Sequence, residues 1–298
     1  MTASAAAVHE GGPRIDLHTH SDRSDGTDSP AALVGLAEAA GLTVVALTDH
    51  DTTIGWVEAS VAAAEHGIEL VRGLEVSVED AGTGYHLLAY EPDPDDHDLR
   101  KMLARSIEAR DERIPLMVER ITVQVPALRL EDVREIAEGA VLGRPHLADA
   151  LVRIGAAADR RSAFTQYLLP GCPTYLETWS PPLTEAIGVI RAAGGATVIA
   201  HPWGRGPHMT PERFRELKAA GLQGIEVDHQ EHDERARREL RQIAKDLDLV
   251  ATGSSDYHGT GKKDHDLGCN TTAEGEYLRL KGLWANYPLV NRPQAFNS

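Results

Sequence analysis

The chain has 298 residues, of which 42% are hydrophobic and 26% are charged, and its formal net charge is −16. These values exclude a disordered chain and a membrane-spanning one, and the length suits one large domain. The negative charge opposes binding to a long nucleic acid, because such binding depends on clustered lysines and arginines. The first 12 residues lack the features of a secretory signal. We therefore expect a cytoplasmic protein that does not associate with a membrane and has no obligate protein partner.

Short β-rich runs alternate with helical segments along the chain, which is the pattern of an α/β fold. Helix boundaries are marked by their usual residues: Thr210 and Pro211, for example, begin a predicted helix that Gly221 ends. We predict strands over residues 14–18, 43–49, 70–78, 85–90, 196–201, 224–228 and 249–254.

The strand pattern stops between about residues 98 and 170, where the sequence predicts successive helices. A cluster of prolines and acids, EPDPDDHD at 91–98, has the composition of a linker into this helical segment. We interpret residues 98–172 as a helical cap that is inserted between a first part of the α/β domain, 14–97, and a second part, 173–298.

Residues of metal-binding type recur at the predicted strands. We expect each of them at or just beyond the carboxyl end of a strand, where parallel α/β folds collect their functional groups. His18 and His20 are two apart on an extended segment, so they share a face and can hold one ion, while Gly26 allows a turn that aims Asp25 at them. The candidate ligands are His18, His20, Asp25, His50, Glu75, His86, His201, Asp256 and His258.

Six imidazoles and three carboxylates without a thiolate suit Mn²⁺, Fe²⁺ or Zn²⁺ better than Ca²⁺ or Mg²⁺. Nine ligands exceed the needs of one ion, so we expect two or three divalent ions with open positions for water and substrate. A single histidine or aspartate at a strand end usually has a structural role, as a hydrogen-bonded polar residue or a helix cap. Such roles do not explain why residues of metal-binding type occur at all seven predicted strands. The other histidines, such as His232 and His265, are expected to be solvated.

The segments that carry these ligands resemble the metal motifs of the PHP (polymerase and histidinol phosphatase) superfamily. The motifs are DLHTHSDRSDGT, LTDHD, GLEVS, AHP, SSDYHG and the histidine of YHLLAY, within about residues 14–90 and 174–265. The resemblance implies a distorted seven-stranded βα barrel. It also implies three metal groups, which are His18, His20, Glu75 and Asp256; Asp25, His50 and His258; and Glu75, His86 and His201.

Within this superfamily, the chain most resembles the stand-alone phosphoesterases with a helical insertion, a placement that LGRPH at 142–146 supports. That resemblance implies hydrolysis of phosphate monoesters of small nucleotides, AMP or 3′,5′-nucleoside bisphosphates, by a metal-bound hydroxide. Three alternatives stay open: an amidohydrolase or deaminase, an exoribonuclease acting on short oligoribonucleotides, and a non-catalytic PHP module.

Five further residues are candidates for contact with the substrate. Arg144 is a candidate phosphate clamp, because a guanidinium offers a planar fork to phosphate oxygens. His229 is a candidate acid for the leaving oxygen. Arg205 and His208 are candidates to contact the substrate, and Trp203 to stack on a base. For each of them a purely structural role, in a salt bridge or in a surface loop, is an open alternative.

Overall fold

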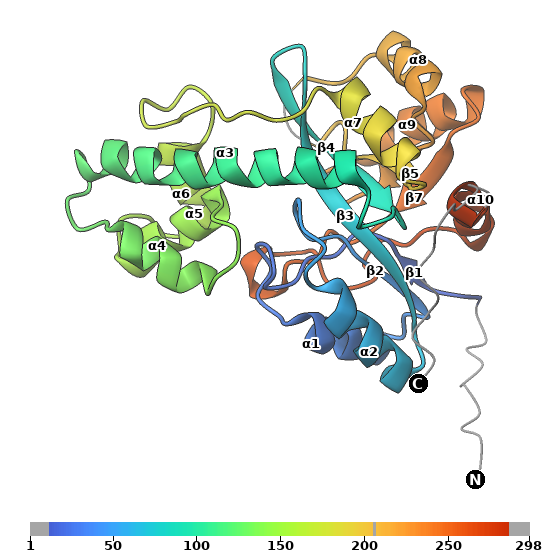
Figure 1. Ribbon diagram of the computed structural model, residues 1–298, viewed down its shortest axis with the longest axis horizontal. Helices are drawn as coiled ribbons and strands as arrows, with labels where there is room; N and C mark the ends of the chain where they lie inside the picture. The colour runs from blue at the N-terminus through green and yellow to red at the C-terminus, as the bar shows by residue number, and fades with distance from the viewer. Residues whose placement is uncertain (1–11, 205–206, 286–298) are drawn as a thin grey trace.

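The computed structural model describes residues 12–204 and 207–285 (Figure 1). Among these residues, seven strands form one sheet in chain order. Its two edges meet at a parallel bridge between Thr19, after the first strand, and Tyr257, after the last, so the sheet is a nearly closed barrel. The predicted α/β barrel is therefore confirmed. The strands are β1 (Ile15–Asp16), β2 (Val44–Leu47), β3 (Glu69–Asp80), β4 (Thr83–Tyr90), β5 (Ala196–Ala200), β6 (Gly224–Asp228) and β7 (Val250–Gly253).

Strand β4 runs antiparallel to both of its neighbours, whereas the other strand pairs are parallel. Ala81 and Gly82 form the tight turn between β3 and β4, with φ angles of 50° and 81° that match the right-handed twist of a hairpin. Our expectation that every ligand follows the carboxyl end of a strand is therefore wrong for two residues. Glu75 lies in the middle of β3, and His86 lies in the first half of β4, because the hairpin extends past the edge of the sheet.

Helices surround the barrel (Figure 1). Thr210 accepts a hydrogen bond from the Arg213 backbone through its hydroxyl, Pro211 begins the helix, and Gly221 ends it with a φ of 114°, as predicted. No helix among the described residues is long and apolar enough to cross a membrane. The helices outside the cap are α1 (Pro30–Ala39), α2 (Trp56–His66), α7 (Leu183–Ala192), α8 (Pro211–Ala220), α9 (Glu234–Asp246), α10 (Glu274–Ala285) and the 3₁₀ turn η2 (Gly259–Gly261).

Two hydrophobic cores hold the barrel, one on each face of the sheet. Because side chains alternate along a strand, Val45 and Leu47 of β2 join the outer core under the helices, while Val44 and Ala46 join the inner core. The inner core consists of strand residues and of α10, which contributes Trp284. These cores fix the strands, and the strands fix the loops at their ends.

The cap has a hydrophobic core of its own. It contains α4 (Leu130–Ala137), α5 (Arg144–Arg153), α6 (Arg160–Ala163), the π-helical turn η1 (Phe164–Leu168) and the far end of α3 (His97–Thr122). Helix α3 runs from the barrel into the cap (Figure 1). Its Leu99 and Met102 pack in the outer barrel core, whereas Ile114 and Met117 pack in the cap core. One continuous helix therefore connects the two units.

Candidate metal centre

The structure brings all nine predicted metal ligands together at one edge of the barrel. In the first group, the Nε2 atoms of His18 and His20 lie 3.0 Å apart, and they lie 3.2 and 3.1 Å from Oε2 of Glu75. Oδ1 of Asp256 is 3.5 and 3.4 Å from the same two nitrogens. Four ligand atoms therefore face one point, in the grouping that the resemblance implies.

The second group gathers around Asp25. Its Oδ1 lies 3.3 Å from Nε2 of His258, and its Oδ2 lies 3.8 Å from Nε2 of His50. Nδ1 of His20 is 3.7 Å from Oδ1 of Asp25, so the imidazole of His20 lies between the first and second groups.

The third group contains the other oxygen of Glu75. Oε1 of Glu75 lies 2.7 Å from Nδ1 of His86 and 3.2 Å from Nε2 of His201. Glu75 therefore presents one carboxylate oxygen to the first group and one to the third, which is the arrangement of a bridging ligand.

The donor atoms of the cluster fit divalent metal ions. Nδ1 of His20, His50 and His86 is buried, and within the described part of the chain none of these atoms makes a well-directed hydrogen bond, although Oε1 of Glu75 lies 2.7 Å from Nδ1 of His86. Buried polar atoms are otherwise nearly always paired, so unpaired imidazole nitrogens that converge with carboxylates are the expected sign of metal ligands. Several His, Asp and Glu groups of the cluster have their ligand atoms within 4.8 Å of one another.

The charges of the cluster are strongly coupled. Burial disfavours a charge on His20, but hydrogen bonds to Asp256 and Glu75 outweigh it and raise the pKa of His20 to about 9. Burial likewise opposes the charge on Glu75, but His86, His50 and His18 hold the pKa of its carboxyl well below its usual range. In the absence of metal, protons on His18, His20 and His201, whose pKa values are all raised, thus compensate the carboxylates.

This coupling predicts how the stability of the metal-free protein depends on pH. The pKa of His20 is raised in the folded protein. Its contribution to the free energy of unfolding is therefore complete below about pH 6.5, the pKa of an unfolded histidine, and is lost as pH rises through about 9. We expect the free energy of unfolding of the metal-free protein to fall by on the order of 3 kcal/mol between about pH 6.5 and about pH 9. Metal-loaded protein should show no such loss, because metal ligands are already deprotonated.

Thermal unfolding followed by circular dichroism, with chelator-treated and metal-reconstituted samples at each pH, measures this difference. Equal stability of the metal-free protein at pH 6.5 and pH 9 would contradict the predicted protonation of the cluster.

Buried carboxylates behind the cluster orient its ligands, and the sequence interpretation missed them. Glu226 is fully buried in β6; its Oε1 lies 3.1 Å from Nδ1 of His18, and its Oε2 accepts the backbone N–H of His201 at 2.8 Å. With Nδ1–H donating to Glu226, His18 presents the lone pair of Nε2 to the metal group. The contact also holds His201, whose backbone has a φ of 28° that is costly for a residue with a side chain.

Asp49 performs the same task for the loop of Asp25. Its carboxylate accepts the backbone N–H and the hydroxyl of Ser21 at 2.8 and 2.7 Å and the hydroxyl of Ser24 at 2.6 Å. Gly26 packs so closely against this loop that an added Cβ would lie 2.3 Å from the carbonyl oxygen of His20. The small size of Gly26 is what the turn requires, and it allows Asp25 to face the histidines.

The open side of the cluster lies at the third group. The side chain of His86 is 34% exposed, compared with 0% for His18 and His20 and 1% for Glu75. Among these ligands, the side chain of His86 is the one most accessible to solvent.

The cap and the loop after β7 bring further charged residues to the cluster. Arg110 of α3 forms an ion pair with the buried Asp51, next to His50, and donates to the hydroxyl of Ser77 at 2.5 Å. Lys262 forms an ion pair with Oδ2 of Asp256. The sequence interpretation missed both cations.

Two more cap residues lie near the second group. The carboxylate of Asp25 is among the charges that act on His146 and on Arg160. Arg160 is held by Asp149, with Nε 2.8 Å from Oδ1, and it packs against Gly261 in the loop that follows His258. Of the LGRPH motif, it is therefore His146 that approaches a metal-binding loop.

Of the residues predicted to contact the substrate, Arg144 lies in the cap and His229 lies beside the metal ligand Asp256. Arg144 begins α5, donates to the carbonyl of Leu168 at 3.3 Å and lies 5.8 Å from the ring centres of Phe164 and Tyr175. His229 is fully buried; its Nε2 is 3.2 Å from Oδ2 of Asp256, and its Nδ1 accepts the backbone N–H of the loop that follows. Arg205 lies outside the described residues.

Trp203, His232 and His265 are more buried than we expected from the sequence. Trp203 is only 8% exposed, donates its indole N–H to the carbonyl of Met209 and stacks on His208, so it belongs to the core and offers no open face for a base. His232 and His265 are 3% and 9% exposed, not solvated, because each donates to a backbone carbonyl in the packed loops around His229.

Known proteins are similar to this chain over most of its length. Residues 16–123 match the PHP domain family. A 3′,5′-nucleoside bisphosphate phosphatase from Chromobacterium violaceum is 35% identical over 264 residues, which cover 85% of this chain and 90% of the relative. This chain belongs to the PHP family.

Two other relatives of this PHP protein agree with that assignment. A 5′-3′ exoribonuclease from Haemophilus influenzae is 34% identical over 249 residues, which cover 82% of the chain and 90% of the relative. The structure of a metal-dependent phosphoesterase from Bifidobacterium adolescentis has a TM-score of 0.87 and 36% identity, covering 92% of this chain and 97% of the other. The PHP protein is an enzyme, a metal-dependent phosphoesterase, as the motifs predicted.

Proposed function

We propose that this PHP enzyme hydrolyses phosphate monoesters of small nucleotides, with AMP and 3′,5′-nucleoside bisphosphates as the substrate class. The observation that carries the proposal is the third ligand group of Glu75, His86 and His201 on the open side of the cluster. A third group next to the first two suits a phosphoryl group, whose several oxygens need separate partners. Two or three ions of Mn²⁺, Fe²⁺ or Zn²⁺ fit these donors.

When bound, the ions would activate water and neutralise charge on the phosphoryl oxygens. The residues of the chain hold that arrangement. Glu75 keeps the first and third groups adjacent through its two oxygens. Glu226 fixes the ring of His18, and His229 holds Oδ2 of Asp256. His86 marks the side from which the phosphate enters.

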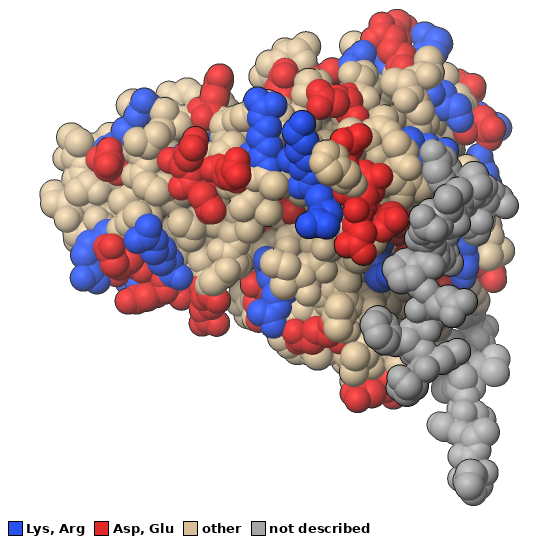
Figure 2. Space-filling view, viewed as in Figure 1, with Lys and Arg blue, Asp and Glu red and all other residues tan. Residues whose placement is uncertain are grey.

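The surface favours a small substrate over a long polyanion. The formal net charge is −16, and Figure 2 shows acidic and basic side chains intermixed over one face rather than a continuous basic surface. Counterion release by clustered cations is therefore not available along this face. Removal of nucleotides from the 5′ ends of short oligoribonucleotides is a second candidate, favoured by the similarity to the exoribonuclease from Haemophilus influenzae.

We also propose that His229 acts as the acid for the leaving oxygen and that His208 contacts the substrate. His229 as acid would have to act from a fully buried position, and its contact with Asp256 gives it a positioning role in addition. His208 is exposed at the end of the loop that follows β5, where a substrate passing His201 would meet it.

A substrate screen tests the proposal, in which phosphate release, release of nucleoside monophosphates and amide cleavage are each followed. Nucleoside monophosphates, 3′,5′-bisphosphates, short 5′-phosphorylated oligoribonucleotides and an amide substrate are supplied with Mn²⁺, Fe²⁺ or Zn²⁺ in parallel. We expect the highest kcat/KM with a mononucleotide. Release of nucleoside monophosphates from the oligoribonucleotides alone would favour the second candidate, and cleavage of the amide alone would contradict both.

A further inference from the structure

The second ligand group is built largely from loops that bond to each other. Asp25 lies in the loop that follows β1, and His258 comes directly before the turn η2. The backbone N–H of Thr260 in η2 donates to the hydroxyl of Thr27 at 3.0 Å, which joins the two loops. Because both ligands lie outside the strands, the sheet alone does not fix Asp25 relative to His258.

His146, in the first turn of α5, reaches the loop of Asp25 from the cap. It is 6% exposed, and its Nδ1 accepts the backbone N–H of Gly143 at 3.1 Å. The neutral ring therefore carries its proton on Nε2, and His146 forms a hydrogen bond with the backbone of Ser24, the residue before Asp25. The hydroxyl of Ser24 donates to Asp49 at 2.6 Å. The loop of Asp25 is thus held between a carboxylate of the barrel and an imidazole of the cap.

Arg160 of α6 packs on the other loop of the second group. Its Nε donates to Oδ1 of Asp149 at 2.8 Å, and Asp149 lies on α5 three residues after His146, so both contacts start from one face of this helix. The guanidinium lies directly against Gly261 of η2, where an added Cβ would be 2.5 Å from its Nη1. Arg160 therefore packs on the turn that follows His258.

The remaining ligand of the second group, His50, also has a neighbour that contacts a helix of the cap. Arg110 of α3 forms an ion pair with Asp51, the residue after His50. Each of the three chain segments that supply the second group is therefore in contact with α3, α5 or α6. Residues that hold a ligand in place from behind influence metal affinity strongly, although they do not touch the ion.

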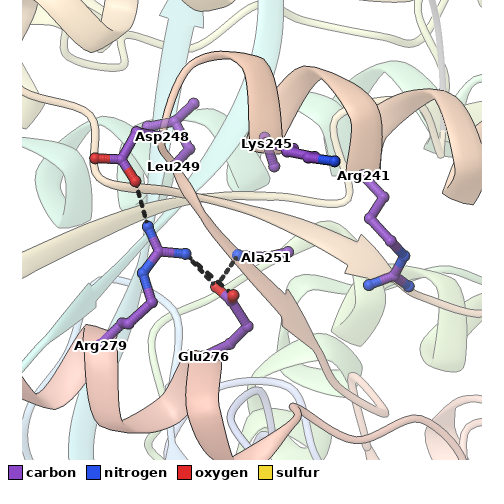
Figure 3. A pocket seen from close by; sticks show the side chains of 8 residues that line it. Arg241, Lys245, Asp248, Leu249, Ala251, Glu276 and Arg279 are labelled. Atoms are coloured by element: carbon purple, nitrogen blue, oxygen red, sulfur yellow. Dashed lines mark hydrogen bonds and ion pairs between the residues drawn. The ribbon is translucent and has the colours of Figure 1, made fainter.

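Ion pairs at the other end of the barrel connect elements that carry no ligand. A recess of about 320 Å³ between α9, β7 and α10 lies at the amino end of β7, whereas Asp256 and His258 follow its carboxyl end (Figure 3). In this recess Arg279 pairs with Asp248 and Glu276. Loss of Arg279 is therefore a suitable control for the loss of an arginine that is not near the cluster.

We propose that the cap is a structural part of the second metal site, with His146 and Arg160 as positioning residues. Docking of α5 and α6 on the barrel and binding of the second ion then strengthen each other, because a coupling between two binding events is reciprocal. An ion held by Asp25, His50 and His258 fixes the loops on which the cap docks. This inference concerns the loading of the metal centre and holds for any phosphate substrate.

Equilibrium dialysis of chelator-treated protein against rising free Mn²⁺, followed by elemental analysis, tests the first direction of the coupling. For His146→Ala we expect one ion per chain to require about tenfold or more free Mn²⁺ than in wild type, with the other binding unchanged. His146→Gln keeps an N–H donor and should recover most of this loss. Two controls should bind Mn²⁺ like wild type: Arg279→Met, and Arg153→Met on α5, since Arg153 pairs with Asp132 and Glu135 inside the cap.

Gly261→Ala tests the same contact from the barrel side and leaves the core of the cap unchanged. The added methyl group displaces the guanidinium of Arg160, so we expect the same loss of affinity for one ion. Circular dichroism and the melting temperature of the metal-free variant should stay close to those of wild type. Unfolding of His146→Ala together with normal Mn²⁺ binding by Gly261→Ala would overturn the proposal, because His146 would then serve only the fold of the cap.

Hydrogen exchange followed by mass spectrometry tests the reverse direction. We expect Mn²⁺ to slow amide exchange in α5 and α6 of wild type by about tenfold, the factor that reciprocity requires, and Gly261→Ala to abolish most of this protection. Equal exchange of α5 and α6 with and without Mn²⁺ would overturn the coupling, and so would equal Mn²⁺ binding by wild type, His146→Ala and Gly261→Ala. A wild type that binds fewer than two ions would overturn it as well. Neither measurement uses a substrate, so failure of the proposed function is distinguished from failure of this inference.

Discussion

Glu75→Gln is expected to lower kcat/KM by at least about a thousandfold while the barrel remains folded. Glu75 is 1% exposed and offers one oxygen to the first ligand group and the other to the third. A glutamine has one acceptor oxygen and no charge, so one of the two groups would face an amide N–H₂. The strands keep their own cores, which do not depend on this side chain.

Phosphate release and circular dichroism on the same preparations measure this effect. Glu79→Gln is the matched control, because Glu79 lies on the same face of β3 but bonds the hairpin turn at Gly82, away from the cluster. Near-normal turnover of Glu75→Gln, or a control that loses as much, would contradict the bridging role.

Glu226→Gln is expected to weaken metal binding or activity by about ten- to a hundredfold, although it touches no substrate. The two oxygens of Glu226 serve two donors, Nδ1–H of His18 and the backbone N–H of His201. Burial opposes its ionisation, but His18 holds the pKa of Glu226 at about 2, so the residue is charged. The glutamine would present its N–H₂ to one of the two donors and release either the ring of His18 or the strained backbone of His201.

Metal titrations of apo protein, combined with kcat/KM at saturating metal, separate weakened binding from misplacement of the ligands. The matched control is Asp228→Asn at the end of the same strand, since Asp228 pairs with Arg241 at the surface. If Glu226→Gln binds metal and turns over like this control, Glu226 does not orient the ligands.

The strand positions could be predicted because each strand is a short apolar run with clear limits. The prediction of 224–228 coincides with β6, and the motifs placed His18 and His201 just after β1 and β5. The sequence could not show that β4 reverses its direction, because the apolar pattern of a strand is the same in both senses. His86 therefore belonged to the predicted cluster although the reasoning about its strand end was wrong.

The residues that support the cluster depend on contacts between distant parts of the chain. Glu226 lies inside a buried strand, and its partner His18 is 208 positions away. A charged residue in the middle of an apolar run was the available signal, and it was not used. Arg110 carried a similar signal, because it is a charged residue in a helix, α3, whose other face is apolar, and it contacts Asp51 beside His50. Trp203 carried none, since its stacking with His208 arises only in the folded loop.

The number of metal ions per chain tests the central claim most directly. Elemental analysis of protein reconstituted with Mn²⁺, Fe²⁺ or Zn²⁺ and freed of excess metal gives this number, and the same samples can be assayed for phosphate release. The three ligand groups around Glu75 predict two to three tightly bound ions, with activity that rises as they are loaded. Fewer than one ion per chain, or full activity without metal, would contradict the cluster.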